Sequence, residues 1–298
     1  MITETAPAKI NLYLHVGALR RDRLHDLESV FVFVDGGDTV TARPAAALTL
    51  DVKGPFAGAL AREPAANNLV MRAARRLKEE FGVSGGAHLV LDKRLPIASG
   101  VGGGSADAAA ALRALVRLWG LRVSSAHLRR LAFSLGADVP ACLDRAPVRV
   151  AGAGEILSAG PKLPPLWACL VNPRVPMPTG PVFRDFDAAY PRPQAPAPAA
   201  PDGQGYRAVT ALLENTRNDL EAIAIRRQSV IQTVIGRLGR RPGALGARMS
   251  GSGATAFGLF TSAAAAARAG REMAGRGWWS MSAPLCAGDR SQSEWCSR

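Results

Sequence analysis

The chain has 298 residues, of which 48% are hydrophobic and 20% are charged, and its formal net charge is +13 at pH 7. This length suits two domains, and this composition argues against wholesale disorder. No apolar run approaches the roughly 20 residues that span a bilayer, and the first residues lack the basic start and apolar core of a secretion signal. The sequence therefore predicts a folded, cytoplasmic protein that is not inserted in a membrane.

The positive charge is not patterned as in a protein that binds nucleic acid. Many cations lie beside acidic residues on predicted helix faces, as in residues 75–80, and no basic patch or aromatic stacking motif accompanies them. Arginine replaces lysine almost everywhere, which indicates a compositional bias. The four cysteines are scattered and do not cluster with the four histidines. We therefore expect no nucleic-acid partner, no zinc site and reduced thiols.

Taken in chain order, alternating or β-branched segments predict strands, and amphipathic segments predict helices. The strands are predicted over residues 9–16, 29–34, 48–52, 87–92, 148–150 and 167–171. The helices are predicted from Asn67 or Asn68 to Phe81, from Ser105 to Trp119, from Ser125 to Leu135, and from Asn218 toward Leu238. We expect the first strand to be covered on one face and the second to end at residues 35–38.

The most informative stretch is a glycine-rich loop that leads from residue 95 into an alanine-rich helix. Its glycines at 100 and 102–104 let backbone N–H groups turn toward one point, and Ser105 is predicted to cap the helix. Unpaired N–H groups and the dipole at a helix start favour an oxyanion, so the loop is predicted to hold a polyphosphate. It matches neither the Walker pattern nor a dinucleotide fingerprint, and a flexible turn before a helix is the alternative.

The remaining segments divide the chain. A domain boundary is expected near residues 150–162, which separates an N-terminal domain, 1–155, from a C-terminal domain, 156–298. Residues 191–205 are mostly proline, alanine, glycine and polar residues, which predicts a mobile loop rather than a third domain. Residues 247–260 predict two strands joined by a tight glycine turn. The glycines indicate that the backbone comes close to a ligand or to the first glycine loop, and an ordinary hairpin is the alternative.

Four polar residues are candidates for a functional site. Lys9 is a compact ammonium that can approach a phosphate or a carboxylate, and the alternative is a surface lysine on an edge strand. His25 grips a ligand or is solvated in its loop, and Lys93 meets a phosphate or is solvated in a turn. Asp138 follows a predicted helix end and precedes a pre-proline segment that should be extended, so it projects from a corner or forms a turn.

Three separated stretches, residues 7–12, 95–106 and 249–254, resemble in order and spacing the three motifs of the GHMP small-molecule kinases. The resemblance covers nearly the full chain, and residues 136–140 and 218–221 add to its specificity. It implies an α+β, two-domain GHMP kinase-like fold. An N-terminal ATP-binding domain would be followed by a C-terminal α/β-sandwich domain, with the substrate bound between them.

The resemblance also implies the reaction. Within the family it is closest to members that use ATP to phosphorylate the 2-hydroxyl of a cytidine diphosphate-linked methylerythritol, in non-mevalonate isoprenoid precursor synthesis. Mg²⁺ is inferred from the ATP chemistry, without named ligands, and the oligomeric state is left open. Another GHMP kinase, acting on homoserine or mevalonate, is one alternative, and a noncatalytic RNA-binding protein is another.

Residue roles follow from the resemblance position by position. It implies that Asp138 is the catalytic aspartate that accepts the hydroxyl proton, and that Lys9 pairs with it. The implied ATP-binding residues are Asn68, Lys93, Pro96, Ile97, Ala98, Ser99, Gly100, Val101, Gly102, Gly103, Gly104, Ser105 and Ala106. The implied substrate-binding residues are Asn11, His25, Asp138, Thr179, Phe183, Gly251, Ser252 and Gly253. Leu24 stands where many relatives have tyrosine, so one aromatic wall of the implied cytosine slot is missing.

Overall fold

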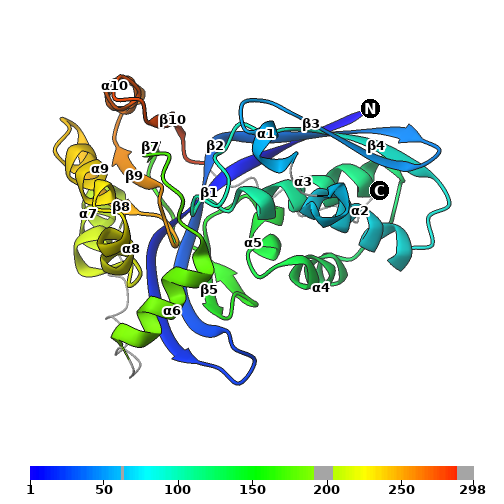
Figure 1. The fold of residues 1–298 in the computed structure, drawn as a ribbon, viewed down its shortest axis with the longest axis horizontal. Coiled ribbons are helices and arrows are strands. Elements are labelled where there is room, and N and C mark those ends of the chain that lie inside the picture. Colours follow the sequence, from blue (N-terminus) through cyan, green and yellow to red (C-terminus); the bar gives the residue numbers. More distant parts are fainter. Residues whose placement is uncertain (62–63, 191–203, 287–298) are drawn as a thin grey trace.

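A computed structural model describes residues 1–61, 64–190 and 204–286, and in this part the chain forms two β-sheets with helices packed on them (Figure 1). The first sheet has the strand order β3-β4-β2-β5-β6, and β1 pairs with β2. Its strands are β1 (Ile2–Leu19), β2 (His25–Ala45), β3 (Leu48–Lys53), β4 (Gly86–Asp92), β5 (Val148–Gly152) and β6 (Ile156–Ala159). The second sheet has the order β10-β7-β9-β8 and consists of β7 (Trp167–Asn172), β8 (Ala244–Met249), β9 (Ala256–Phe260) and β10 (Trp279–Pro284).

Most helices fall into two groups that accompany the two sheets (Figure 1). The first group is α1 (Ala57–Leu60), α2 (Leu69–Glu80), α3 (Gly103–Leu118), α4 (Ser125–Leu135) and α5 (Val139–Asp144), of which α2 to α5 lie together on one side of the first sheet. The second group is α7 (Gly205–Asn215), α8 (Glu221–Arg227), α9 (Val230–Gly239) and α10 (Ala263–Ala274). Helix α6 (Thr179–Ala189) lies beside β1 and β2, where Val182 and Phe186 pack with Leu14 and Val16 (Figure 1). Within the described ranges, no helix has the length and apolar character needed to cross a membrane.

The hairpin of β1 and β2 is longer and more deeply buried than the sequence predicts. Strand β2 does not end at residues 35–38, because Gly37 accommodates a shift of register opposite Pro7 and Ala8. Gly37 has φ +153°, and a Cβ there would lie 2.3 Å from the Ala6 carbonyl oxygen. The prediction that β1 is covered on one face is also wrong, since every residue from Ala6 to Leu14 is buried.

The predicted helices are confirmed in kind, with two corrections. Helix α2 is capped by Asn68, whose side chain accepts a hydrogen bond from the Val70 N–H. Helix α3 begins two residues before the predicted cap, because Gly102 in the left-handed conformation turns the chain and Ser105 lies inside the helix. The predicted helix 218–238 is two helices, α8 and α9, separated at residues 228–229. Helices α1, α5, α6, α7 and α10 were not predicted, and α5 replaces a segment that was expected to be extended.

Two hydrophobic cores position the site. In the first, the alanine-rich helix α3 buries Ala108 to Ala111 between the first sheet and the neighbouring helices α2 and α5, and the small side chains allow close packing on all sides. Each larger side chain in this core, such as Leu112, contributes about 1.5–3 kcal/mol through burial. The second core joins Ile10 of β1 and Val32 of β2 to side chains of the second sheet, including Phe257. The two sheets therefore share buried surface.

Three sequence predictions concern boundaries and thiols. The domain division between residues 155 and 156 stays a prediction, although the pairing of β6 with β5 favours a division a few residues later. Of the loop predicted over 191–205, residues 191–203 lie outside the described residues, and Gly205 begins α7. The described cysteines, Cys142, Cys169 and Cys286, are free thiols.

Candidate active site

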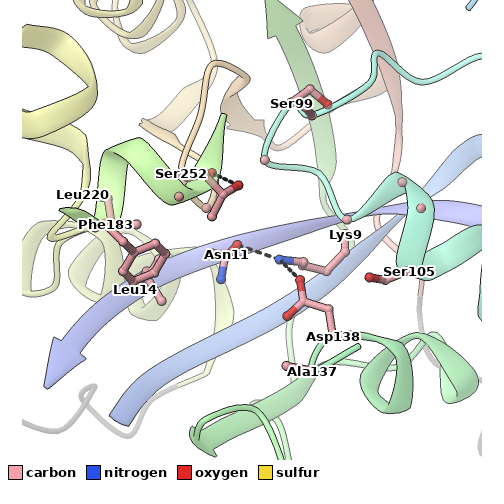
Figure 2. Close-up of a pocket in the computed structure, with 18 of the residues that line it drawn as sticks. Lys9, Asn11, Leu14, Ser99, Ser105, Ala137, Asp138, Phe183, Leu220 and Ser252 are labelled. Atoms are coloured by element: carbon pink, nitrogen blue, oxygen red, sulfur yellow. Dashed lines mark hydrogen bonds and ion pairs between the residues drawn. The ribbon is translucent and has the colours of Figure 1, made fainter. Parts of the chain in front are cut away.

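A pocket of about 950 Å³ lies where the separated motifs meet (Figure 2). Figure 2 shows Ser105 and Phe183 on opposite sides of the pair formed by Lys9 and Asp138, with Asn11 between Lys9 and Phe183. The predicted residues that line it are Lys9, Asn11, His25, Asn68, Lys93, Pro96, Ile97, Ala98, Ser99, Gly100, Gly102, Gly103, Gly104, Ser105, Asp138, Thr179, Phe183, Gly251 and Ser252. Val101, Ala106 and Gly253 are not among its lining residues and lie behind them.

Lys9 and Asp138 form an ion pair in the middle of the pocket. The Lys9 Nζ is 3.0 Å from Asp138 Oδ2, and the Lys9 side chain is 5% exposed against 35% for Asp138. Asp138 is not followed by an extended segment: its φ and ψ are −82° and −15°, and it is the N-cap of α5. Pro140 is tolerated in the first turn of that helix, where backbone N–H groups lack intrahelical partners. The Asp138 carboxylate does not cap the helix, so it is free to face Lys9.

A short chain of polar contacts fixes the Lys9 ammonium. Its Nζ donates to Asn11 Oδ1 at 3.0 Å and lies 4.2 Å from the centroid of the Phe31 ring. The Asn11 amide in turn donates to Ser29 Oγ at 3.0 Å, and Ser29 donates to the Tyr13 carbonyl. All of these residues belong to β1 and β2, so the hairpin holds the amine in one position.

The glycine-rich loop wraps over β1 and leads into α3. Ala98, Gly100 and Gly102 have positive φ values of 49°, 78° and 63°, which gives the tight turns. The Lys9 N–H donates to the Val101 carbonyl at 2.9 Å, so the loop is pinned to the strand that carries the lysine. A Cβ on Gly102 would lie 3.0 Å from Lys9 Cε, and Gly102 also has a left-handed φ of 63°, so the position favours glycine. The loop and the N-terminus of α3 line the pocket next to Lys9, and the unpaired N–H groups and dipole of a helix start suit an anion.

The second glycine turn, between β8 and β9, packs against the first glycine loop. Ser250 Oγ donates to the Gly100 carbonyl at 2.8 Å, and the Thr255 N–H donates to the Ser99 carbonyl at 3.1 Å. A Cβ on Gly100 would lie 2.2 Å from the Ser250 carbonyl oxygen. Among the alternatives that the sequence left open, the hairpin is present, and its close backbone approach is to the loop. Ser252 also contacts Thr179 Oγ1, at 2.9 Å.

Lys93 lies beneath the loop and is held by two buried carboxylates. Its Nζ is 2.5 Å from Asp38 Oδ2 and 2.7 Å from Asp107 Oδ2. Burial lowers the pKa of Lys93, but Asp107 and Asp38 raise it more, so its net pKa is above the ordinary value. Burial raises the pKa of Asp107 to about 7, although the Lys93 charge opposes this shift. The solvated alternative for Lys93 is wrong, and its phosphate contact stays a prediction.

The far end of the pocket is built around His25 and α6. His25 is the first residue of β2 and is buried, so the solvated alternative is wrong for it as well. Its ring stacks on Phe183 with the centroids 5.3 Å apart and an interplanar angle of 27°. Leu24 is 46% exposed and also lines the pocket. It is the residue that stands where many relatives have tyrosine.

Sequence reasoning missed two pocket residues of this region, Arg184 and Asp187. Both lie on α6, which was not predicted. For Asp187 a signal was available in helical spacing: positions three or four residues from Phe183 share its face of the helix, and these include Gly180 and Asp187. Arg184 is adjacent to Phe183 in the sequence and has no such signal. Arg23, which has a positive φ of 65°, is another charged pocket residue without a predicted role.

Comparison with known families gives the class of the protein. Residues 68–145 match the model described as "GHMP kinases N terminal domain", and residues 204–277 match "GHMP kinases C terminal". The two sheets, the loop-to-helix cradle and the pocket between the motifs are thus those of a GHMP kinase. This confirms the predicted α+β, two-domain fold and the prediction of an ATP-dependent kinase.

Relatives narrow the class further. A 4-diphosphocytidyl-2-C-methyl-D-erythritol kinase of Paramagnetospirillum magneticum is 46% identical over 94% of this chain and 97% of its own length. The protein of the same name from Ruegeria pomeroyi is 49% identical over 92% and 95%. A crystal structure of 4-(cytidine 5'-diphospho)-2C-methyl-D-erythritol kinase has a TM-score of 0.76 and 32% identity, covering 97% of this chain and 100% of that chain. The chain belongs to the family of 4-diphosphocytidyl-2-C-methyl-D-erythritol kinases.

Proposed function

We propose that this chain transfers the γ-phosphoryl group of ATP to the 2-hydroxyl of 4-diphosphocytidyl-2-C-methyl-D-erythritol, a step in non-mevalonate isoprenoid precursor synthesis. The observation that carries the proposal is a single pocket that joins a glycine-rich cradle, the Lys9–Asp138 pair and the stacked rings of His25 and Phe183. The names of relatives that are 46% and 49% identical over nearly their full lengths support the choice of substrate.

We assign the chemical step to the ion pair of Lys9 and Asp138 in the middle of the pocket. Asp138 accepts the proton of the substrate hydroxyl as the oxygen attacks the γ-phosphorus. The Lys9 ammonium, 3.0 Å from that carboxylate, offsets negative charge on the transferring group. Phosphoryl transfer passes through a loose transition state, so catalysis depends mainly on placement and electrostatic support. Asn11 and Phe31 hold the ammonium where that support is needed.

We assign the ATP phosphates to the glycine-rich loop and the adenine side of the pocket to Asn68, which lines it. Backbone N–H groups at the start of α3 point toward the pocket, and the helix dipole favours negative charge there. The contacts of Gly100 and Val101 with Ser250 and Lys9 keep the loop in its bent conformation before ATP binds. Such preorganisation reduces the entropy lost on binding.

The start of α3 also has a feature that suits Mg²⁺. Asp107 lines the pocket, and its Oδ1 is buried without a hydrogen-bond partner in the described structure. The described residues contain no group of three or more acidic, histidine or cysteine side chains arranged as a metal site. Mg²⁺ in kinases is commonly held by one or two carboxylates together with substrate phosphates, and we assign Asp107 Oδ1 as the protein ligand. The ion would neutralise phosphate charge during transfer.

The assay that tests the proposal is ADP release with ATP and 4-diphosphocytidyl-2-C-methyl-D-erythritol. Asp138→Asn should lower kcat by about 10²–10⁴-fold, the usual contribution of a general base, with little change in the KM for ATP. Lys9→Ala should also lower kcat strongly. Asp144→Asn is the matched control, because Asp144 lies on the same short helix and pairs with Arg129. Full activity of both site variants would overturn the assignment.

A different alcohol substrate is the competing function. The structure of a homoserine kinase has a TM-score of 0.66 at 21% identity, which supports a shared fold only. Inhibition by CDP that is competitive with the alcohol substrate is expected for a cytidine slot. Turnover of homoserine or mevalonate without any effect of CDP would instead favour that other member of the class.

A further inference from the structure

Asp187 is a pocket residue that the mechanism above does not use. It lies on α6, one helical turn after Phe183, so both side chains are on the same face of the helix. Its Oδ1 is 3.1 Å from Nε2 of His25, and its side chain is 41% exposed. The carboxylate is therefore accessible from the pocket while one of its oxygens touches the imidazole.

The imidazole beside Asp187 is fixed by its other contacts. His25 Nδ1 is 3.2 Å from the Gly17 carbonyl oxygen, and a carbonyl only accepts, so Nδ1 carries the proton of this hydrogen bond. The Phe183 ring stacks on one face of the imidazole, and Phe186 meets it edge-on with the centroids 6.2 Å apart. A carboxylate also only accepts, so the 3.1 Å contact needs a proton on Nε2 as well, and Nε2 donates to Asp187 Oδ1. The other oxygen of the Asp187 carboxylate remains as a polar edge beside the aromatic face, where it can accept a hydrogen bond from a ligand.

This polar edge distinguishes two pyrimidines by their hydrogen-bonding groups. Cytosine presents an exocyclic amino group, which donates, next to a ring nitrogen that accepts. Uracil presents a carbonyl, which accepts, next to a ring N–H. An ionised carboxylate can only accept hydrogen bonds. A uracil carbonyl placed against Asp187 would leave two acceptors facing each other without a proton between them, which is costly in a partly buried site.

We propose that Asp187 accepts a hydrogen bond from the exocyclic amino group of the substrate's base, and thereby makes this pocket select cytidine over uridine diphosphates. The inference rests on the proposed function, because it concerns the base-binding end of the same site. Leu24 lines the pocket with an aliphatic side chain rather than a second ring, and an aliphatic contact discriminates poorly between bases. The hydrogen bond to Asp187 would supply the discrimination instead.

The test is calorimetric titration of CDP and UDP into the full chain in the presence of a nonhydrolysable ATP analogue. The wild-type chain should bind CDP about tenfold or more tighter than UDP, as expected for a donor matched to a charged acceptor. In Asp187→Asn the ratio should fall toward one, because an amide both donates and accepts. Asp185→Asn is the matched control, since Asp185 is on the same helix but pairs with Arg227 outside the pocket. It should keep the wild-type ratio.

Two results would overturn the inference while the proposed function stands. One is an Asp187→Asn variant that keeps the CDP-to-UDP ratio. The other is equal weakening of both nucleotides, which would mean that Asp187 only holds the His25 ring. ADP release with the cytidine substrate separates these results from failure of the proposed function. If the wild-type chain binds neither nucleotide and turns over no cytidine substrate, both proposals fall. Unchanged affinity for the ATP analogue in both variants excludes misfolding as the cause.

Discussion

Lys9 shows how a buried cation is placed by the sequence around it. Its ammonium contacts a carboxylate, an amide oxygen and an aromatic face, and each contact comes from a different residue: Asp138, Asn11 and Phe31. A buried charge is costly unless it is paired, and a cation over a ring gains about 2 kcal/mol when desolvated. Two of the three partners lie on the same hairpin as Lys9, so the lysine is held before Asp138 or a substrate contributes.

His15 is another buried titratable residue of β1, and it makes the free energy of unfolding depend on pH. Its Nδ1 has no hydrogen-bond partner in the described structure, and its Nε2 accepts from the Arg217 N–H. Burial lowers the pKa of His15 below its ordinary value of 6.5. The unfolded chain therefore takes up a proton at this residue at a higher pH than the folded chain does. Below about pH 7 this uptake favours unfolding, so the free energy of unfolding should fall as pH falls.

The variant His15→Gln tests this dependence, because its amide oxygen can still accept from the Arg217 N–H. Denaturant unfolding between about pH 8 and about pH 5 should show a smaller loss of stability in the variant than in the wild-type chain. Asn215→Gln, an exposed substitution at the end of α7 that removes no titratable group, is the control and should keep the wild-type slope. Equal slopes for wild type and His15→Gln would contradict the prediction.

At the scale of elements, the two glycine turns act as one structure. The turn of residues 250–255 rests on the loop of residues 98–102 through two hydrogen bonds. A methyl group on Gly100 would collide with the Ser250 carbonyl, and Gly100 also has a positive φ of 78°. Gly100→Ala should therefore distort the ATP cradle as well as strain the backbone.

We expect Gly100→Ala to lower the affinity for an ATP analogue by at least tenfold, and to lower the free energy of unfolding by more than the roughly 1 kcal/mol that a left-handed alanine costs. Gly82→Ala isolates the backbone effect, because Gly82 has φ +61° and nothing lies within 4 Å of its added Cβ. Calorimetric titration and denaturant unfolding measure the two quantities. An equal loss of stability in both variants, with ATP binding intact, would show that the contact with Ser250 is unimportant.

The same elements show what sequence could and could not predict. The capped helix α2 and the hairpin of β8 and β9 have strong local signals, and both were predicted. Helix α3 was placed two residues late, because the left-handed Gly102 is a feature of loop packing rather than of local propensity. Motif resemblance implied Lys9, Asp138 and His25, while Asp187 was missed because its helix follows a proline-rich segment that resembles a loop.

At the scale of the whole molecule, the shared core makes the two sheets interdependent. Ile10 and Val32 of the first sheet pack in the same cluster as Leu170 and Phe257 of the second. Strand β10 ends next to β2, where the Cys286 N–H donates to the Phe33 carbonyl at 2.7 Å. Neither sheet can lose its structure without exposing apolar surface of the other.

Unfolding should therefore be a single cooperative transition. Differential scanning calorimetry should show one peak, with a calorimetric enthalpy close to the van't Hoff enthalpy. Phe257→Ala, which opens a cavity in the shared core, should lower the midpoint of that one peak by several degrees without splitting it. Two resolved peaks, of which only one responds to an ATP analogue, would show that the sheets unfold as separate domains.

The contact between Ser250 and Gly100 also limits how this protein can be recombined. One of the hydrogen bonds that hold the glycine-rich loop comes from a residue 150 positions downstream of Gly100. A chimera that takes its C-terminal half from another GHMP kinase would import a foreign turn beneath residues 98–102. An exchange of the C-terminal domain should therefore keep the turn of residues 250–255 matched to the loop of residues 98–102. The two segments have to be transferred together, or the loop has to be mutated to fit the new turn.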